Sequence, residues 1–298
     1  MDRLTAMQMF VRVVETGSFS AVAREMGTTQ SGVSKQVAAL ERHLGTPLLA
    51  RTTRALSLTD EGRIYLESAQ RVVQDAEEAE LTVRAGRERL SGRLRLGASV
   101  GFGRLVLFPV LQRFMASHPG VTVDLQLSDG FVDVVGEGLD AAVRIGELGD
   151  SALVAQRVGT TERAAVASRT WLDALPKGQH APLVPEDLAQ HPCIVYTGLT
   201  TRNHWAFEHG GKTRVVEVSG PLATSSSEIV REAVLAGMGI GFSPTWLFSP
   251  ELASGAVLRL LPGYAPPPLP IHVVYPPSRR HSARVSALAA CLREAKLS

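Results

Sequence analysis

Two helical patterns open the chain. Apolar residues recur at spacings of three and four over 4–14, so one face of a helix is apolar, and Gly17 follows it. Ser18 is a residue type that caps helix N-termini, and a second, shorter pattern runs over 19–26 before Gly27. Because glycine often ends a helix and serine often begins one, we expect two helices separated by a tight turn.

A third helix is predicted directly after the second. Thr28 or Thr29 caps its start, and Gly45 ends it. Its buried stripe, spaced by four, three and four residues, consists of Val33, Val37, Leu40 and Leu44. Two short helices joined by a glycine-containing turn, the second longer and polar on one side, are typical of a helix-turn-helix.

The polar side of the third helix is a candidate DNA-reading surface. Near its N-terminus it presents hydroxyl or amide side chains and one cation: Gln30, Ser31, Ser34 and Lys35. A helix that enters the major groove needs small residues for close approach, and hydroxyl or amide groups to bind base edges. An ordinary solvated helix face is the alternative, and this helix alone does not decide between them.

A short hairpin with two arginines follows the third helix. Arg51 and Arg54 stand in the sequence Arg-Thr-Thr-Arg, between Pro47-Leu48-Leu49 and Leu56-Ser57-Leu58-Thr59. Two cations beside a groove-reading helix are what a wing needs to contact phosphate or the minor groove. The pattern therefore favours a winged helix-turn-helix over 1–58, with double-stranded operator DNA as its partner.

The stretch from Phe10 to Gly62 resembles the LysR-type transcriptional regulator family. The residues that carry the resemblance are Gly17-Ser18-Phe19-Ser20-Ala21, Thr29-Gln30-Ser31, Val33-Ser34, Ala39-Leu40-Glu41, Leu44-Gly45, Pro47-Leu48-Leu49, Arg51, Arg54 and Leu58-Thr59-Asp60-Glu61-Gly62. The chain departs from the family at Gly32, where alanine is more frequent, and at Ala55, where a further basic residue is common. The resemblance implies an effector-responsive transcription regulator that dimerises through its linker helix and often forms dimers of dimers. RNA polymerase is a further expected partner.

A long helix is predicted after the hairpin. Residues 59–89 contain no proline, and their two glycines lie near the ends. An apolar seam spaced by four and three residues consists of Tyr65, Ala69, Val72, Ala76, Ala79 and Val83. A narrow seam with acidic flanks favours pairing with the same helix of a second copy, whereas packing on the chain's own body is the alternative. We therefore assign 59–90 to a linker and dimerisation helix.

The remaining residues, 91–298, alternate between strands and helices, which predicts an α/β domain. The first block is a βαβ unit with parallel strands, followed by one more strand: 93–98, helix 104–117, 121–127 and 139–145. The second block has strands at 163–167, 193–196 and 214–218 and a helix at 227–236, and the chain then returns to a strand at 271–275 and a helix at 281–295. We expect two lobes, lobe I over 91–161 and 268–298 and lobe II over 162–267. The resemblance implies a periplasmic-binding-protein-like arrangement of these lobes around an effector cleft.

Candidate effector-binding residues follow from where such sheets bind ligands, beyond the carboxyl ends of strands and near helix N-termini. In lobe I they are Ser99, Val100, Gly101, Phe102, Phe131 and Arg144, and in lobe II they are Thr197, Arg202, Thr224, Ser225 and Ser226. By the resemblance, Ser99 and Ser128 fall where family members often bind effectors, and the strand before Pro244 borders the cleft. Serine and glycine also serve as caps and turns, which is the alternative for each of them.

The expected effector is a small organic molecule. Free N–H groups at two facing helix starts, with Arg144 or Arg202 as countercharge, favour a carboxylate.

Enzyme motifs are missing from the sequence. The glycines at 97–103 and 237–241 lack the spacing or context of a dinucleotide-binding turn, and 204–209 is one residue too long for an inverted zincin motif. We expect no enzymatic activity, no metal and no cofactor. Two other classes stay open: a constitutive DNA-binding protein whose C-terminal domain only assembles the oligomer, and a solute-binding or catalytic domain with a regulatory head.

Charge and cysteine content refine this interpretation. The net charge is only +2, but residues 1–58 carry seven Lys or Arg against four Asp or Glu, and residues 59–80 carry two against seven. A basic head followed by an acidic helix is the distribution expected if only the head meets phosphate. Cys193 and Cys291 form no disulfide framework, and we find neither a signal-peptide pattern nor an 18-residue apolar run. We therefore expect a cytoplasmic protein with no membrane partner.

Overall fold

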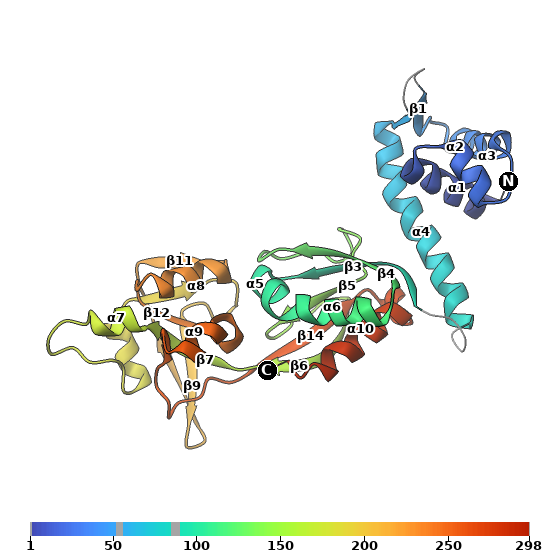
Figure 1. The fold of residues 1–298 in the computed structure, drawn as a ribbon. Helices are drawn as coiled ribbons and strands as arrows, with labels where there is room; N and C mark the ends of the chain where they lie inside the picture. Colours follow the sequence, from blue (N-terminus) through green and yellow to red (C-terminus); the bar gives the residue numbers. More distant parts are fainter. Residues whose placement is uncertain (1, 52–55, 85–89, 298) are drawn as a thin grey trace. The chain divides into compact units, whose positions relative to one another are not determined.

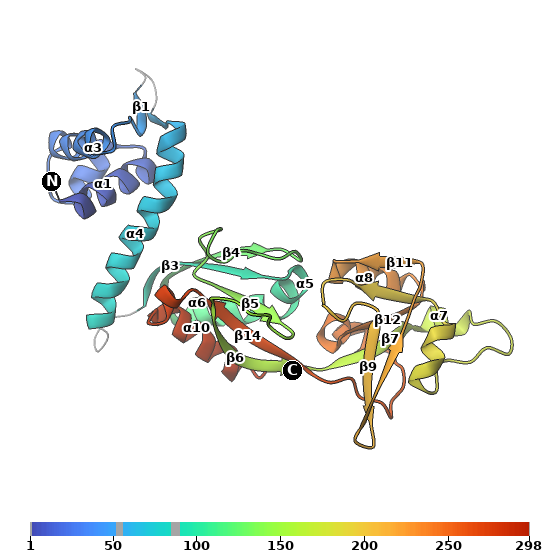
Figure 2. The ribbon, with the colours of Figure 1, turned by 180° about the vertical axis from the view of Figure 1, so that it is seen from behind.

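The computed structural model describes residues 2–51, 56–84 and 90–297. The chain divides into two compact units, Met1–Glu88 and Arg89–Ser298, called unit 1 and unit 2 below. Figures 1 and 2 show the fold of each unit from opposite sides. No helix in the described ranges is long and apolar enough to cross a membrane.

Unit 1 is a helix-turn-helix followed by a hairpin and a long helix (Figure 1). Its elements are α1 (Arg3–Thr16), α2 (Phe19–Glu25), α3 (Gln30–Leu44), β1 (Leu49–Arg51), β2 (Leu56–Leu58) and α4 (Asp60–Arg84). The side chain of Ser18 caps α2 and that of Thr29 caps α3, while Gly17 and Gly45 end α1 and α3 in the left-handed backbone region. The residues that the pattern marked as caps and breakers therefore set these helices.

The hairpin is joined tightly to its neighbours on both sides. The carboxylate of Glu41 in α3 accepts hydrogen bonds from the backbone N–H groups of Leu48 and Leu49, at 2.9 and 3.0 Å. A Cβ at Gly62 would lie 2.0 Å from the carbonyl oxygen of Leu48, so only glycine lets α4 begin this close to the hairpin. These contacts hold the start of the hairpin against the end of α3 and the beginning of α4.

The first part of α4 belongs to the core of unit 1, which corrects part of the pairing seam. Ala69 is only 1% exposed, and the Tyr65 ring lies 5.9 Å from that of Phe10 in α1, because this turn of α4 packs on α1. Val72 is 46% exposed, and Ala76 is partly exposed. The last two seam residues, Ala79 and Val83, lie in α4, but their side chains are outside the described part.

Lobe I of unit 2 is a five-stranded mixed sheet with helices packed on it (Figure 2). In spatial order its strands are β4 (Gly120–Leu127), β3 (Ser91–Ala98), β5 (Ala141–Ile145), β14 (Leu269–Tyr275) and β6 (Val154–Thr161). β3 runs parallel to β4, as predicted, and also to β5, whereas β14 runs antiparallel to β5 and β6. The core packs between this sheet and the helices α6 (Phe108–Ser117) and α10 (Ala283–Glu294).

Lobe II has a second five-stranded sheet and a separate hairpin. In spatial order its strands are β11 (Leu222–Thr224), β8 (Cys193–Tyr196), β12 (Ile240–Pro244), β7 (Arg163–Ser168) and β13 (Val257–Arg259). The hairpin consists of β9 (His204–His209) and β10 (Lys212–Glu217), and the helices are α7 (Arg169–Asp173), α8 (Ser227–Leu235) and α9 (Ser249–Ser254). The chain crosses between the lobes twice, from β6 into β7 and from β13 into β14, so each lobe is built from distant segments (Figure 1).

Several elements differ from the sequence prediction, and α7, α9, β11 and β13 were not predicted at all. The helix expected over 104–117 begins earlier, as α5 (Val100–Phe102), and then passes through a π-helical turn at Gly103–Leu107 before α6. The strand expected at 214–218 is one arm of the β9–β10 hairpin, whose other arm was not predicted. The pattern also missed β6, which has mixed burial and no clean alternation.

Candidate functional site

The candidate DNA surface lies at the N-terminal end of α3. Gln30, Ser31 and Lys35 are exposed, and Ser34 is partly buried one turn along the same helix. The hydroxyl of Ser31 lies 3.1 Å from that of Thr29, the cap residue. This face presents amide, hydroxyl and ammonium groups while the opposite stripe is buried in the core of unit 1.

The unusual glycine in this helix has a local explanation. A Cβ at Gly32 would lie 3.0 Å from the hydroxyl of Thr28 and 3.2 Å from that of Thr29. Glycine therefore leaves room for two threonine hydroxyls at the start of α3, at the cost of helix propensity.

The predicted wing is described only in part. Residues of β1 and β2 pair antiparallel, with Leu49 opposite Leu58 and Arg51 opposite Leu56. The side chain of Arg51 and the whole of Arg54 lie outside the described part. The hairpin itself has the form that the sequence predicts.

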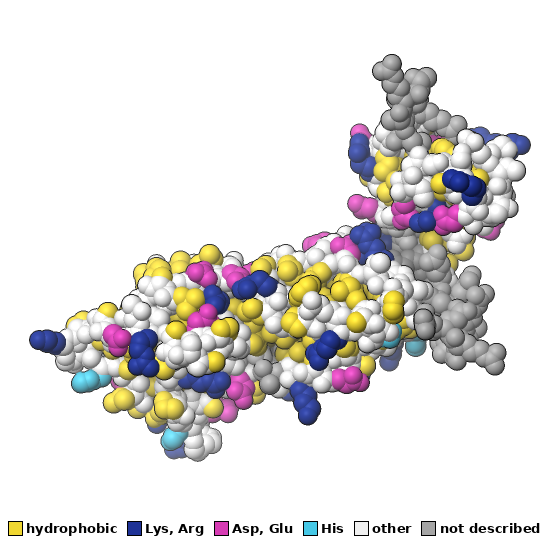
Figure 3. Space-filling model, in the orientation of Figure 1, with side chains coloured by type: hydrophobic (Ala, Val, Ile, Leu, Met, Phe, Trp, Pro, Cys, Tyr) yellow, Lys and Arg dark blue, Asp and Glu magenta, His cyan; other side chains and the backbone are white. Residues whose placement is uncertain are grey.

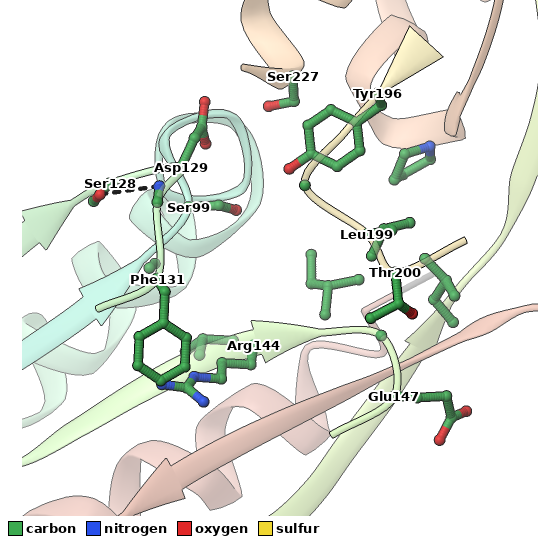
Figure 4. Close-up of a pocket in the computed structure, with 18 of the residues that line it drawn as sticks. Ser99, Ser128, Asp129, Phe131, Arg144, Glu147, Tyr196, Leu199, Thr200 and Ser227 are labelled. Carbon is green, nitrogen blue, oxygen red and sulfur yellow. Dashed lines mark hydrogen bonds between the residues drawn. The ribbon is translucent and has the colours of Figure 1, made fainter. Parts of the chain in front are cut away.

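A cavity of about 440 Å³ lies between the two lobes of unit 2. Lobe I contributes the ends of β3 and β5 and the loop after β4, and lobe II contributes the start of β7, the loop after β8, the first turn of α8 and β12. Figure 4 shows Ser99, Ser128 and Asp129 on one side of this space and Tyr196 and Ser227 on the other. The volume falls in the range of small-molecule sites.

Five of the predicted effector residues line the cavity: Ser99, Ser128, Phe131, Arg144 and Pro244. They lie at or near the ends of β3, β4, β5 and β12; the rule based on strand ends pointed to Ser99, Phe131 and Arg144, whereas the family resemblance pointed to Ser128 and Pro244. The guanidinium of Arg144 lies against the Phe131 ring, 4.8 Å from its centre, and donates to the carbonyl oxygen of Val132 at 2.9 Å (Figure 4). Arg144 is therefore already engaged within lobe I, and burial lowers the pKa of its guanidinium.

The other eight predicted residues do not line the cavity: Val100, Gly101, Phe102, Thr197, Arg202, Thr224, Ser225 and Ser226. Phe102 is fully buried in the core of lobe I, with its ring edge against Trp246. Thr197 donates its N–H to the carbonyl oxygen of Thr224, which continues the pairing of β8 with β11. Being next to a lining residue in the sequence does not turn a side chain towards the cavity.

At each of the two helix starts, one N–H group of the expected cradle already has a protein partner. The N–H of Val100 donates to the carboxylate of Asp129 at 2.9 Å. The N–H of Ser226 donates to the hydroxyl of Thr224 at 3.1 Å. A ligand carboxylate could bind these two N–H groups only by displacing the Asp129 carboxylate or the Thr224 hydroxyl.

The sequence prediction missed several lining residues of lobe II. Buried polar atoms without a hydrogen-bond partner in the described ranges include the hydroxyl of Ser227, the indole N–H of Trp246 and Nε of Arg163, and all three residues line the cavity. Tyr196 lines it too, and burial together with the charge of Asp129 raises the pKa of its phenol. Tyr196 and Ser227 belong to the strand end and helix start that the sequence marked as the edge of lobe II, whereas Arg163 and Trp246 had no such signal.

The two lobes touch beside the cavity. Arg104, in the π-helical turn of lobe I, pairs with Glu228 in the first turn of α8 at 2.8 Å. A Cβ at Gly101 would lie 2.7 Å from the hydroxyl of Ser227, so glycine allows α5 to approach α8. The cavity is thus closed on one side by contact between lobes.

Comparison with known families gives two matches that together span nearly the whole chain. Residues 4–63 match the bacterial regulatory helix-turn-helix protein model of the lysR family, and residues 87–296 match the LysR substrate binding domain. The transcriptional regulator PtxR of Pseudomonas aeruginosa is 37% identical over 291 residues, covering 98% of this chain and 92% of that protein. DmlR of Escherichia coli is 33% identical over 296 residues, covering 98% and 94%.

Solved structures agree with these matches. CrgA, a LysR-type transcriptional regulator from Neisseria meningitidis, superposes with a TM-score of 0.61 at 31% identity and covers 98% of both chains. The resemblance seen in the sequence and the expected fold class are both confirmed. Members of this family are regulators and not enzymes, which agrees with the expectation that the chain has no enzymatic activity. The chain belongs to the LysR-type family of DNA-binding transcriptional regulators, with an N-terminal helix-turn-helix and a C-terminal effector-binding domain.

Proposed function

We propose that this regulator reads its operator with the exposed face of α3 and is controlled by a small molecule bound between the lobes of unit 2. For the DNA surface, the support is the group of Gln30, Ser31, Ser34 and Lys35 near the start of α3. Amide and hydroxyl groups select base edges, whereas cations such as Arg51 and Arg54 in the wing contact phosphate without selecting a sequence. The two sets therefore have separable roles.

The observation that supports the effector site is the cavity itself. It combines aromatic walls with polar atoms of Ser227, Trp246 and Arg163 that have no hydrogen-bond partner among the described residues. Buried polar groups without partners are costly, and a bound molecule with matching groups would satisfy them. A ligand that touches both lobes stabilises one arrangement of the lobes and so shifts the population towards it.

We propose further that the chain acts as a homo-oligomer. The exposed Val72 and the partly exposed Ala76 stand on α4 beyond the turns that pack on α1. On unit 2, Figure 3 shows hydrophobic side chains gathered over the α6 side of lobe I, where Phe108 is 48% exposed. The regulator would act in the cytoplasm, with RNA polymerase as its partner at operators that lie near promoters.

A screen by thermal unfolding of the full-length chain tests the effector site. A compound present at about a hundred times its Kd stabilises the folded chain by about 2.7 kcal/mol, which raises the Tm by several degrees. We expect Ser99→Leu, which fills the cavity from the end of β3, to remove this shift. Ser286→Leu, on the exposed side of α10, is the matched control and should keep it.

The same compounds are then titrated against the chain bound to operator DNA. A compound that raises the Tm should also change operator affinity, because the lobes and the DNA heads are parts of one regulator. A shift in Tm that persists in Ser99→Leu would place the binding site elsewhere and contradict the proposal.

A further inference from the structure

Arg163 stands where the two crossings between the lobes meet. It is the first residue of β7, directly after the first crossing, and its Nη2 donates to the carbonyl oxygen of Pro267 in the second crossing at 3.1 Å. Its guanidinium lies 4.7 Å from the ring centre of Phe242, in β12. The side chain thus contacts both crossings and also lines the cavity.

The guanidinium of Arg163 has no acidic partner in the part of the chain that the structure describes. Within residues 2–51, 56–84 and 90–297, no carboxylate lies within ion-pair distance, and its Nε is buried without a hydrogen-bond partner. The neighbouring Glu162 is exposed and pairs with Arg259 instead, at 3.7 Å. Burial lowers the pKa of Arg163 to about 10, and no nearby charge opposes that effect. A buried cation without a counterion is destabilising unless a bound group supplies the opposite charge.

The other charged residues of the cavity already have roles. Arg144 donates to the carbonyl oxygen of Val132 and lies under Phe131, and Asp129 holds the N–H of Val100. Glu147 is exposed and lies apart from Arg144, Phe131 and Asp129 (Figure 4). Among the charged groups that line the described cavity, Arg163 is therefore the one with an unused buried donor.

We infer that Arg163 binds an anionic group of the effector, a carboxylate, whose aromatic or aliphatic body packs against Phe242, Phe131 and Trp246. This inference rests on the proposed effector site and specifies its ligand class. The charge pair forms at the junction of the two crossings, so binding restrains the segments about which the lobes move. The sequence pattern had pointed to Arg144 or Arg202 for this role, but Arg144 is engaged and Arg202 does not line the cavity.

Phenylacetate and phenylacetamide test the inference, because they share one body and differ in charge. Both are titrated into the full-length chain at constant ionic strength, and the Tm and the heat of binding are measured. We expect phenylacetate to bind at least about tenfold more tightly than the amide, since charge-assisted hydrogen bonds are the stronger ones. Arg163→Gln should abolish this preference, and the matched control Arg214→Gln, whose guanidinium lies over the Tyr264 ring and does not line the cavity, should keep it.

Each other outcome overturns the inference in a distinguishable way. Equal binding of the two compounds would remove the role of charge but leave a ligand site in the cavity. A preference that survives Arg163→Gln and is lost in Arg144→Gln would assign the anion to Arg144. No binding of phenylacetate to the wild-type chain would exclude an anion site there, while neutral compounds found by the screen would still support the cavity. If Arg163→Gln does not fold, Arg163→Met repeats the measurement with an unbranched side chain that can still pack on Phe242.

Discussion

Replacing Asp140 with alanine is expected to destabilise unit 2 by about 3–5 kcal/mol, the cost of breaking a buried ion pair. The Asp140 side chain is almost fully buried; one oxygen lies 3.0 Å from Nε of Arg279, and the other accepts the N–H of Arg95 at 2.8 Å. Removing the carboxylate leaves Arg279, itself only 11% exposed, without this countercharge. Because Arg95 is in β3 and Asp140 leads into β5, the loss also loosens two strands whose ends line the cavity.

Denaturant unfolding of the full-length chain measures this effect. Asp150→Ala is the matched control: it removes an exposed carboxylate of the same lobe and should change the free energy of unfolding by less than about 0.5 kcal/mol. Asp140→Asn keeps an acceptor for the Arg95 N–H, so we expect a smaller loss than with alanine. Equal stability of Asp140→Ala and the wild type would show that the pair with Arg279 contributes nothing.

The double variant Val72→Glu, Ala76→Glu is expected to separate the oligomer and to weaken binding to a paired operator by about 100-fold or more. Two linked heads bind two half-sites with a gain of about 10²–10⁴ over one head, and that gain disappears with the dimer. Charge placed in an apolar contact between two α4 helices has no partner there, so association becomes unfavourable. Binding to a single half-site should change little.

Sedimentation and binding to one- and two-site DNA measure both effects. Gln70→Glu is the control, because it adds charge to the same helix outside the seam. If the double variant keeps the wild-type oligomer, α4 does not form the interface, and its seam serves only to pack on unit 1.

Local patterns predicted the elements of the fold well where one residue sets a boundary. Ser18, Thr29, Gly17 and Gly45 cap or end helices through their own side chains or backbone freedom, so the sequence alone places those helices. The π-helical turn at Gly103–Leu107 was missed because the periodicity of the surrounding helix hides it. The sequence also could not show that Ala69 packs in the core of unit 1. Its spacing fits a coiled-coil seam equally well, and only its packing against α1 distinguishes the two.

The cavity was predictable only in part. Ser99 stands at a strand end, which a general rule for sheets locates without a structure, whereas Ser128 was indicated by the resemblance to the family. Arg163 and Trp246 reach the cavity because two crossings bring distant segments together, which no local spacing encodes. Phe102 shows the opposite error, since it follows Ser99 closely but its helix turns it into the core.

The ratio of operator affinity to random-DNA affinity tests most directly the central claim, that the exposed face of α3 reads DNA sequence. The operator is selected from a random pool with the wild-type chain, and the ratio is then measured for the wild type, Gln30→Ala, Ser34→Ala and the control His43→Ala, which lies at the far end of α3. The account predicts that Gln30→Ala and Ser34→Ala each lower the ratio about 5- to 150-fold, which corresponds to a loss of about 1–3 kcal/mol in binding free energy at the operator. The control should leave the ratio unchanged. An unchanged ratio in both variants would contradict it.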